Sequence, residues 1–399
     1  MIIWSIGHLK LGLAFSAARI RTRSSTTRAI AGENRSASKW SKGLAQRKGI
    51  HSGASDVVIF GETLRRILIC RPNARLGNTL LLTPLVQEIE RSCPWAEVDI
   101  LTSCPAAPEI FRESLSVRNI YQAPHYAVRH PVAHVATLLN AHRTSYDLVI
   151  DPCPRSWSSR FATRLMKARI KLGFASAQKH GGVNLEIAEA GAPLHMGLYP
   201  VYLFRSAIRF SLAVVEHAPM PVPTIALTSI EKSRGRNKLK QIMKERKSTL
   251  TLAVALNATG DKRIEPEWWR ELLENIAAQV NVRVIEILPA SGVAFLPEYP
   301  GYFSTSIRRI AAVIQAADCF VSADSGLMHL GAATTTPTIG LFKRANAAVY
   351  APYSHGGCGL CLDSHSTQSI AKEVVRRLSA HETLQPLAVK ATSSPDEQK

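Results

Sequence analysis

The chain lacks any run of about 18 to 20 uninterrupted apolar residues, the length that a helix needs to cross a bilayer, so we expect no membrane span. Cysteine is scarce: seven residues, an odd number, are spread over 399 positions. That pattern is unlike the dense, even framework of a small secreted domain and favours a reducing compartment. Acidic residues are also few, since 30 Asp and Glu oppose 49 Lys and Arg. The net charge of +19 favours an anionic partner, and nucleic acid, phosphate and a membrane surface are the candidates.

Apolar residues are plentiful, at 46% of the chain against 20% charged residues. This composition supplies enough material for hydrophobic cores and excludes a wholly disordered chain. At about 100 to 200 residues per domain, the length predicts two globular domains with additional segments.

The first 48 residues carry ten Lys or Arg and one acidic residue, Glu33. Their Ser, Arg and Ala content is typical of a transit peptide, and residues 1–20 can form a basic amphipathic helix on an anionic membrane. A disordered tail or a misassigned start codon is the alternative. We therefore interpret residues 1–60 as a basic tail, disordered or at a membrane surface, and residues 386–399 as a polar tail.

Short β-branched runs alternate with amphipathic helical patterns from Arg66 onward, which predicts βαβ units and parallel sheets. Three prolines in Pro219–Pro223 predict an extended linker between domains of residues 61–218 and 219–385. The predicted strands are Ile67–Ile69, Val98–Leu101, Leu148–Ile150 and Ile170–Gly173, then Thr249–Leu256, Val282–Leu288, Cys319–Ser322 and Thr338–Phe342. The predicted helices of the second domain are Glu267–Ala278, Ile307–Ala316 and Ser325–Ala333.

Ligands of such sheets bind beyond the carboxyl ends of the strands, which directs attention to the loops after Cys70, Leu256, Leu288 and Ser322. After the first strand, Gly77 permits a tight turn and Asn78 is a good N-cap for the following helix, which Pro84 should kink. A helix start at this edge suits an anion or an acceptor hydroxyl. The alternative is simply a well-capped first helix.

A second helix start follows the strand Cys319–Ser322. The backbone N–H groups of Ser325, Gly326 and Leu327 can hold a diphosphate there, where a small residue permits close approach. His329 lies one turn later on the same face, within reach of the same ligand. A structural histidine is the alternative.

Near the C-terminus, His355, Cys358, Cys361 and His365 have spacings that zinc can accept. A redox pair and ordinary loop thiols are the other interpretations, and we predict no metal site.

Four segments together resemble glycosyltransferase family 9, the ADP-heptose:lipopolysaccharide heptosyltransferases of Gram-negative bacteria. The resemblance covers most of Arg66 to Tyr353. The segments are RILICRP (66–72) with LGNTLLLTP (76–84), YDLVID (146–151), KRIEPEWW (262–269), and DSGLMH (324–329) with APY (351–353).

The resemblance implies a GT-B architecture, an α/β fold in which two Rossmann-like parallel-sheet domains face each other across a cleft. The second domain would hold the nucleotide-sugar, including through Asp324, and the first would hold the acceptor. Family enzymes of this type invert the anomeric centre without a metal or other cofactor, and the chain contains no Asp-x-Asp pair. Lys262 matches the lysine that faces the diphosphate, a role that suits an ammonium near departing negative charge. The Trp that the family carries after this lysine is replaced by Ile264.

One departure concerns the catalytic base. Where these enzymes typically carry an Asp after the glycine of the first turn, this chain has Asn78, and an amide cannot accept the proton of an acceptor hydroxyl. Another carboxylate, Asp151 or Asp324, can serve; the acceptor or nucleotide phosphate can serve; or transfer has been lost.

The leading hypothesis is therefore a cytoplasmic glycosyltransferase at the inner face of the inner membrane. It would move a heptose or related sugar from an ADP-sugar to the lipopolysaccharide core or another anionic glycolipid. Arg71 and Arg75, beside Gly77, are candidates for contacts with acceptor phosphate or carboxylate groups. A nucleotide-sugar-binding homologue without transfer is the alternative. A nucleic-acid partner is disfavoured because no recognition motif accompanies the charge, and a dehydrogenase because the first turn is not Gly-x-Gly-x-x-Gly.

Overall fold

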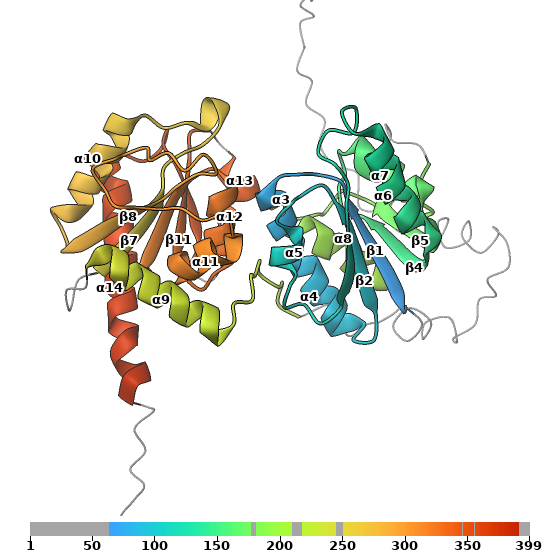
Figure 1. Ribbon diagram of the computed structural model, residues 1–399, viewed down its shortest axis with the longest axis horizontal. Coiled ribbons are helices and arrows are strands. Elements are labelled where there is room, and N and C mark those ends of the chain that lie inside the picture. Colours follow the sequence, from blue (N-terminus) through green and yellow to red (C-terminus); the bar gives the residue numbers. More distant parts are fainter. Residues whose placement is uncertain are drawn as a thin grey trace, which may run out of the picture. The chain divides into compact units, whose positions relative to one another are not determined.

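The structure is a computed structural model, and it describes residues 64–176, 181–209, 218–244, 250–344, 346–354 and 356–390. These residues form two six-stranded sheets with helices on both faces of each (Figure 1). All paired strands run parallel, which agrees with the predicted α/β class of two Rossmann-like domains. The predictions made for residues 1–60 lie outside the described residues.

The first sheet has the strand order β3-β2-β1-β4-β5-β6. Its strands are β1 (Arg66–Arg71), β2 (Glu97–Thr102), β3 (Val117–Gln122), β4 (Ser145–Asp151), β5 (Lys167–Phe174) and β6 (Leu185–Ile187). The helices of this half are α3 (Leu76–Leu80), α4 (Thr83–Ser92), α5 (Ala107–Ile110), α6 (Pro131–Arg143), α7 (Trp157–Leu165) and α8 (Tyr199–Arg209).

The second sheet has the order β12-β11-β10-β7-β8-β9. Its strands are β7 (Leu250–Ala255), β8 (Val282–Ile287), β9 (Gly301–Tyr302), β10 (Cys319–Ala323), β11 (Thr338–Phe342) and β12 (Cys358–Cys361). The helices are α9 (Ser229–Met243), the 3-10 turn η1 (Gly260–Lys262), α10 (Pro266–Ala277), α11 (Ile307–Gln315), α12 (Gly326–Ala332), α13 (Ala347–Tyr350) and α14 (Thr367–Lys390).

The eight predicted strands and three predicted helices are confirmed, with ends shifted by at most three residues. Pro219–Pro223 has no regular secondary structure, as expected of an extended linker. The prediction for the first helix was wrong in two respects. Asn78 is the third residue of α3, whose N-cap is Arg75, and Pro84 lies in the first turn of a separate helix, α4. Proline is tolerated there because the first-turn N–H groups have no intrahelical partner, so Pro84 begins a helix and bends none.

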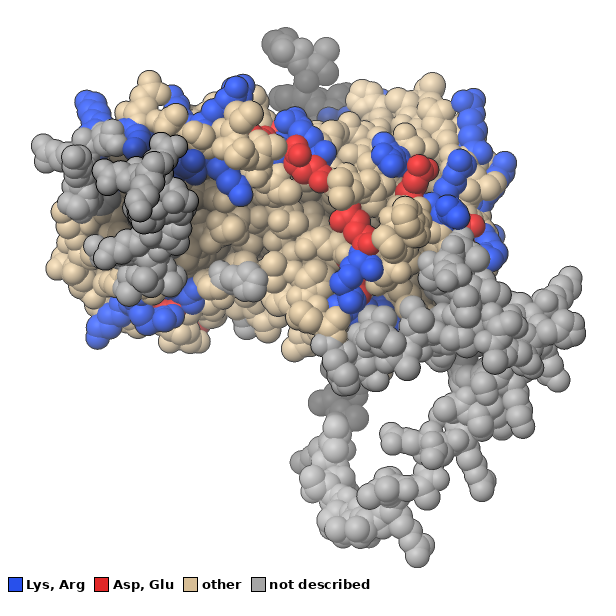
Figure 2. Space-filling view, turned by 90° about the horizontal axis from the view of Figure 1, so that it is seen from below, with Lys and Arg blue, Asp and Glu red and all other residues tan. Residues whose placement is uncertain are grey.

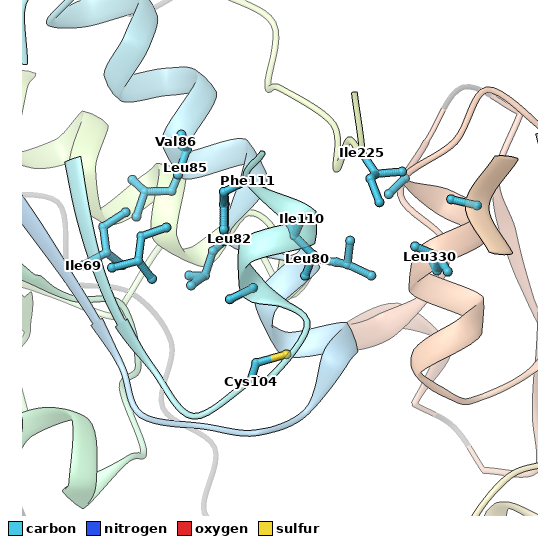
Figure 3. Close-up of a cluster of buried hydrophobic side chains, with 14 of the residues drawn as sticks. Ile69, Leu80, Leu82, Leu85, Val86, Cys104, Ile110, Phe111, Ile225 and Leu330 are labelled. Atoms are coloured by element: carbon cyan, nitrogen blue, oxygen red, sulfur yellow. The ribbon is translucent and has the colours of Figure 1, made fainter. Parts of the chain in front are cut away.

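The buried side chains form three hydrophobic clusters. The largest packs α4, α5 and α8 on one face of the first sheet and continues to α9, α11 and α12 of the second half; Leu80 of α3, Ile225 of the linker and Leu330 of α12 all belong to it (Figure 3). A small cluster lies under α6 and α7 on the opposite face of the first sheet. The third lies between the second sheet and the helices α10 and α14.

Arg308 of α11 is the main buried cation of the second half, with a side chain only 2% exposed. Its guanidinium lies 2.6 Å from both carboxylate oxygens of Glu231, and it also donates to the carbonyl oxygens of Ala226 and Glu109. The Arg308 hydrogen bonds lower the pKa of Glu231 to about 2, against the opposing effect of burial. Glu231 and Thr228 also form a capping box at the start of α9. One ion pair therefore ties α11 to α9, the linker and α5.

Among the described residues, no helix has both the length and the apolar character needed to cross a membrane.

Candidate active site

Both sheets have the same topology, because each is built in the order third, second, first, fourth, fifth, sixth of its own strands. In such sheets the strand order reverses between the first and fourth strands, and ligands bind beyond the carboxyl ends at that point. The two reversal points lie between β1 and β4 and between β7 and β10. Every residue predicted from the sequence to catalyse transfer or to bind donor or acceptor lies at the end of one of these four strands or in the loop or helix that follows it.

Lys262 and Asp324 meet at the reversal point of the second sheet. The Nζ atom of Lys262 lies 2.7 Å from Oδ2 of Asp324, and beside them Arg344 lies 2.8 Å from Asp261. These residues line a hollow together with Phe342, Lys343 and Asn346. The hollow carries three cations and two carboxylates, so it has a net positive charge for an anionic ligand to meet.

Helix α12 begins immediately after Asp324. Ser325 is its N-cap residue in extended conformation, and no side chain caps the first turn. The first N–H groups of a helix have no intrahelical partner, so those of Gly326 and Leu327 can donate to a ligand. The structure thus brings Lys262 next to the segment Asp324, Ser325, Gly326 and Leu327. Lys262 and Asp324 are 62 residues apart in the sequence.

His329 lies one turn into α12 and packs against the first half of the chain. A Cβ atom built at Gly77 would lie 2.4 Å from Cδ2 of His329. Gly77 has no positive φ, so the expected tight turn is not the reason for glycine here; the reason is room for the imidazole. Burial, with smaller contributions from His195 and Lys262, lowers the pKa of His329 to about 4. The ring is therefore neutral at pH 7 and can serve a ligand only as a neutral donor or acceptor.

The turn after β1 is organised by Asn73, which the sequence reasoning missed. Its Oδ1 accepts from the backbone N–H of Arg75 at 2.8 Å and from the side-chain amide of Asn78 at 3.0 Å. An Asn that bonds the backbone two residues later is a typical turn former, and that signal was available in the sequence. Asn78 is half-buried, with its amide held towards the turn, and Arg75 is exposed.

Arg71 ends β1 and directs its guanidinium to the sulfur atom of Cys153, just after β4. Its Nε is buried and has no hydrogen-bond partner among the described residues. A buried donor without a partner costs free energy.

Asp151, considered above as a replacement base, is completely buried at the end of β4. Its Oδ2 lies 2.8 Å from Nε of Arg160, and its Oδ1 accepts from Ser159 and from the backbone N–H of Cys153. These bonds fasten α7 to the first sheet. A carboxylate with this burial and these partners is not accessible to an acceptor hydroxyl, and this environment argues against Asp151 as the base.

His195, also missed by the sequence reasoning, joins the loop before α8 to the end of α13. Its Nε2 donates to the carbonyl oxygen of Ala351 at 2.8 Å, and its Nδ1 accepts from the backbone N–H of Gly197. Burial lowers the pKa of His195, which keeps this ring in the neutral form that both bonds require. The backbone of Met196 also donates to Val349. No sequence pattern indicated this contact, because its partners are 156 residues apart.

Glu286 holds the loop between Leu288 and Gly301 in place, a segment that the family resemblance does not cover. This fully buried carboxylate of β8 accepts backbone N–H groups of Phe295 and Leu296 and so fixes the loop. Burial raises the pKa of Glu286. Ile264, which replaces the family's Trp, is buried in the core beneath α10 and α14.

Cys358 and Cys361 lie in the edge strand β12, where residues three apart point to opposite faces of the sheet. His355 lies outside the described residues. Within the part of the chain that the structure describes, no three His, Cys, Asp or Glu side chains are grouped as metal ligands would be.

Positive charge is not confined to the hollow. On the face of the molecule that Figure 2 shows, Lys and Arg side chains outnumber Asp and Glu, and they lie over both halves. Such a surface attracts phosphorylated substrates from solution.

Two parallel sheets of this order, with candidate residues at their carboxyl edges, define the GT-B class of glycosyltransferase fold. A model of glycosyltransferase family 9 (heptosyltransferase) matches residues 136–377, more than half of the chain. This chain belongs to glycosyltransferase family 9.

Solved structures show the same fold at low sequence identity. A glycosyltransferase family 9 protein from Veillonella parvula DSM 2008 is 13% identical with a TM-score of 0.65, over 80% of this chain and 98% of that one. ADP-heptose LPS heptosyltransferase II of E. coli is 16% identical with a TM-score of 0.60, over 80% and 100%. The E. coli heptosyltransferase WaaC, solved with ADP, is 18% identical with a TM-score of 0.56, over 79% and 99%. A search of curated protein sequences found no match.

Proposed function

We propose that this chain transfers a heptose, or a related sugar, from an ADP-sugar to the inner core of lipopolysaccharide, with inversion and without a metal. The observation that carries the proposal is the ion pair of Lys262 with Asp324, which lies beside the uncapped start of α12. An ammonium and a helix N-terminus at one sheet edge suit a diphosphate. The family of the chain, and the similarity to structures described as an ADP-heptose LPS heptosyltransferase and as a heptosyltransferase with ADP, support this donor.

In this proposal the N–H groups of Ser325, Gly326 and Leu327 hold the diphosphate, and Lys262 turns from Asp324 to the phosphate oxygens. The acceptor hydroxyl attacks the anomeric carbon from the face opposite the diphosphate. The bond between that carbon and the diphosphate oxygen breaks, and ADP departs with the electron pair. Lys262 and its neighbours Lys343 and Arg344 meet the charge that develops on ADP, which is the work a metal ion would otherwise perform.

The hydroxyl proton requires a base, and Asn78 cannot supply one. Because Asp151 is buried and both of its carboxylate oxygens are bonded to Ser159 or Arg160, we assign this role to Asp324, the other carboxylate considered from the sequence. When Lys262 moves to the diphosphate, Asp324 loses its ammonium partner, and in this proposal its carboxylate turns to the face of the sugar opposite the diphosphate, where it accepts the proton of the attacking hydroxyl. Asn78 would then orient the acceptor through its amide, next to Gly77.

We propose that Arg71 and Arg75 contact phosphate or carboxylate groups of the acceptor. The position of Arg71 at the end of β1, at the same sheet edge as Arg75 and Asn78, supports this role. The excess of 19 positive charges supports action in the cytoplasm, peripherally at the inner face of the inner membrane, where an anionic glycolipid acceptor would be presented.

A second candidate function is nucleotide-sugar binding without transfer. The observation that favours it is Asn78, whose amide is held by Asn73 and offers no base on the acceptor side. The donor residues on the second sheet would be the same in both cases.

The test is transfer from ADP-heptose to a deacylated inner-core acceptor, followed by mass spectrometry, together with calorimetric titration of ADP. Wild type is compared with Asp324→Asn, Asn78→Asp and Asp151→Asn. We expect Asp324→Asn to lose transfer by about 10²-fold or more while it still binds ADP. Asp151→Asn should lose activity only as far as it loses folded protein. If wild type binds ADP but is inert and Asn78→Asp gains transfer, the binding function is correct and our proposal is wrong.

A further inference from the structure

Helices α6 and α7 present large apolar side chains to solvent. Val132, Val135 and Leu139 of α6, and Trp157, Phe161 and Leu165 of α7, are all exposed, and we call these six residues the α6–α7 surface. Val132 is 82% exposed, Trp157 63% and Phe161 59%. The spacings of three or four residues place each set on one face of its helix. A soluble protein rarely exposes apolar side chains in such contiguous stripes without a partner.

The two stripes are neighbours. Both helices cover the same face of the first sheet, over the small cluster that contains Ala141 and Ala162 (Figure 1). At their C-terminal ends, Nδ1 of His142 donates to the carbonyl oxygen of Leu165 at 2.6 Å. The six side chains therefore form one surface that two helices share.

The outward orientation of α7 is fixed from inside. The single O–H of Ser159 lies between two acceptors, the carbonyl oxygen of Cys70 at 2.6 Å and Oδ1 of Asp151 at 2.5 Å. Arg160 donates to Asp151 and to the carbonyl oxygen of Phe174. With these two residues anchored in the sheet, Trp157 and Phe161, one turn apart, are held on the solvent side. The buried Asp151 network thus positions the exposed aromatic side chains.

The rim of the surface is cationic. Exposed basic side chains flank it and, among the described residues, none of them pairs with a carboxylate; they are Arg129, Arg143, Arg155, Arg164 and Lys167. Between Ser114 and Leu185 the sequence has only two acidic residues, Asp147 and Asp151. Asp147 accepts the backbone N–H groups of Arg65 and Arg66, and Asp151 is buried. The partner of this surface should therefore be anionic.

We propose that the α6–α7 surface docks the protein on an anionic lipid membrane, with Trp157 and Phe161 inserted at the level of the headgroups. Aromatic side chains favour that level, and cations next to an apolar helix face bind anionic lipids. A second copy of the chain and residues 1–48 are poorer partners, because both carry excess positive charge and would repel the rim.

The location suits the proposed function, which this inference deepens and on which its biological purpose rests. In a βαβ unit the helix runs opposite to the strands, so α6 and α7 both begin at the carboxyl edge of the first sheet. Trp157 therefore lies at the same edge as Arg71 and Asn78. Docking there would bring a lipid-anchored acceptor to the proposed acceptor residues.

The test is cosedimentation of the full-length protein with vesicles of phosphatidylethanolamine and phosphatidylglycerol, against vesicles of phosphatidylcholine. We expect the double variant Trp157→Ser, Phe161→Ser to bind the anionic vesicles about tenfold more weakly than wild type. The matched control is Trp95→Ser, a tryptophan 79% exposed outside this surface, which should bind like wild type. In a second pair, Arg155→Ser with Arg164→Ser should weaken binding severalfold, whereas Arg234→Ser with Arg236→Ser, the same charge removed from α9, should have little effect.

The proposal is overturned if wild type does not prefer anionic vesicles, if the aromatic double variant binds as wild type does, or if Trp95→Ser loses as much. It is also overturned if light scattering shows that the double variant changes the oligomeric state while vesicle binding persists, because the surface then joins two copies. Transfer to the soluble deacylated acceptor separates the two proposals. Vesicle binding without any transfer would contradict the proposed function and leave the docking surface standing.

Discussion

Replacing Gly77 with alanine tests the packing of the first turn against His329. The added Cβ would lie 2.4 Å from Cδ2 of the ring, whereas ordinary contacts are 3.4 Å or more, so the imidazole must move by about 1 Å. Overpacking of this kind costs about 1–3 kcal/mol. Alanine inside a helix returns about 0.5–1 kcal/mol relative to glycine, because the unfolded chain has less freedom. We therefore expect Gly77→Ala to lower the free energy of unfolding by about 1 kcal/mol, with an upper limit of about 2.5 kcal/mol, measured by urea denaturation.

The control for this prediction is a double-mutant cycle. In a His329→Ala background the ring is absent, so Gly77→Ala should stabilise the protein by about 0.5–1 kcal/mol. The effect of one substitution thus changes sign with the presence of the ring. An equal destabilisation in both backgrounds would contradict this prediction, because the cost would then not arise from contact with His329.

Two further predictions concern pH and buried charge. Glu231→Gln should lower the free energy of unfolding by about 3 kcal/mol at pH 7, because the buried Arg308 then keeps only the more distant carboxylate of Glu113, at 3.8 Å. The pKa of Glu231 is lowered from 4.5 to about 2, so the ion pair's contribution to the stability of wild type should be lost as the pH falls from 4.5 towards 2. Denaturation at several pH values measures both the loss at pH 7 in Glu231→Gln and the pH dependence of wild type. The exposed Glu267→Gln is the control. The pKa of His329 is lowered from 6.5 to about 4, so its neutral form favours the folded state, and stability should fall as the pH drops from 6.5 towards 4. His329→Gln should remove that part of the pH dependence, and an unchanged profile would contradict it.

The central strands were predictable because a strand that is buried on both faces consists of consecutive apolar, often β-branched residues, as in β1 and β7. The edge strands were not. β3, VRNIYQ, is half-exposed and mixed in character, and β12, CGLC, has no β-branched residue. Such strands form because a neighbour offers unpaired backbone groups, β2 for β3 and β11 for β12, and that is a property of the fold.

The candidate site was predictable only as separate loops. Strand-ending positions and the family resemblance indicated Lys262 and the segment 324–329, but their ion pair arises because β7 and β10 are neighbours in the sheet. The burial of Asp151 depends on Arg160, one helix turn into α7, and a single sequence does not show which way that side chain points. The need for glycine at position 77 arises from contact with the ring of His329, 252 positions later in the sequence.

The most direct test of the proposed function measures the dissociation constant of ADP and the rate of heptose transfer for wild type and Lys262→Met. The matched control is Lys238→Met, which removes an exposed lysine of α9. We predict that Lys262→Met weakens ADP binding by about tenfold and slows transfer by about 10²-fold or more, since Lys262 meets charge that grows in the transition state. Lys238→Met should behave like wild type. Equal ADP binding and equal transfer in wild type and Lys262→Met would contradict the account.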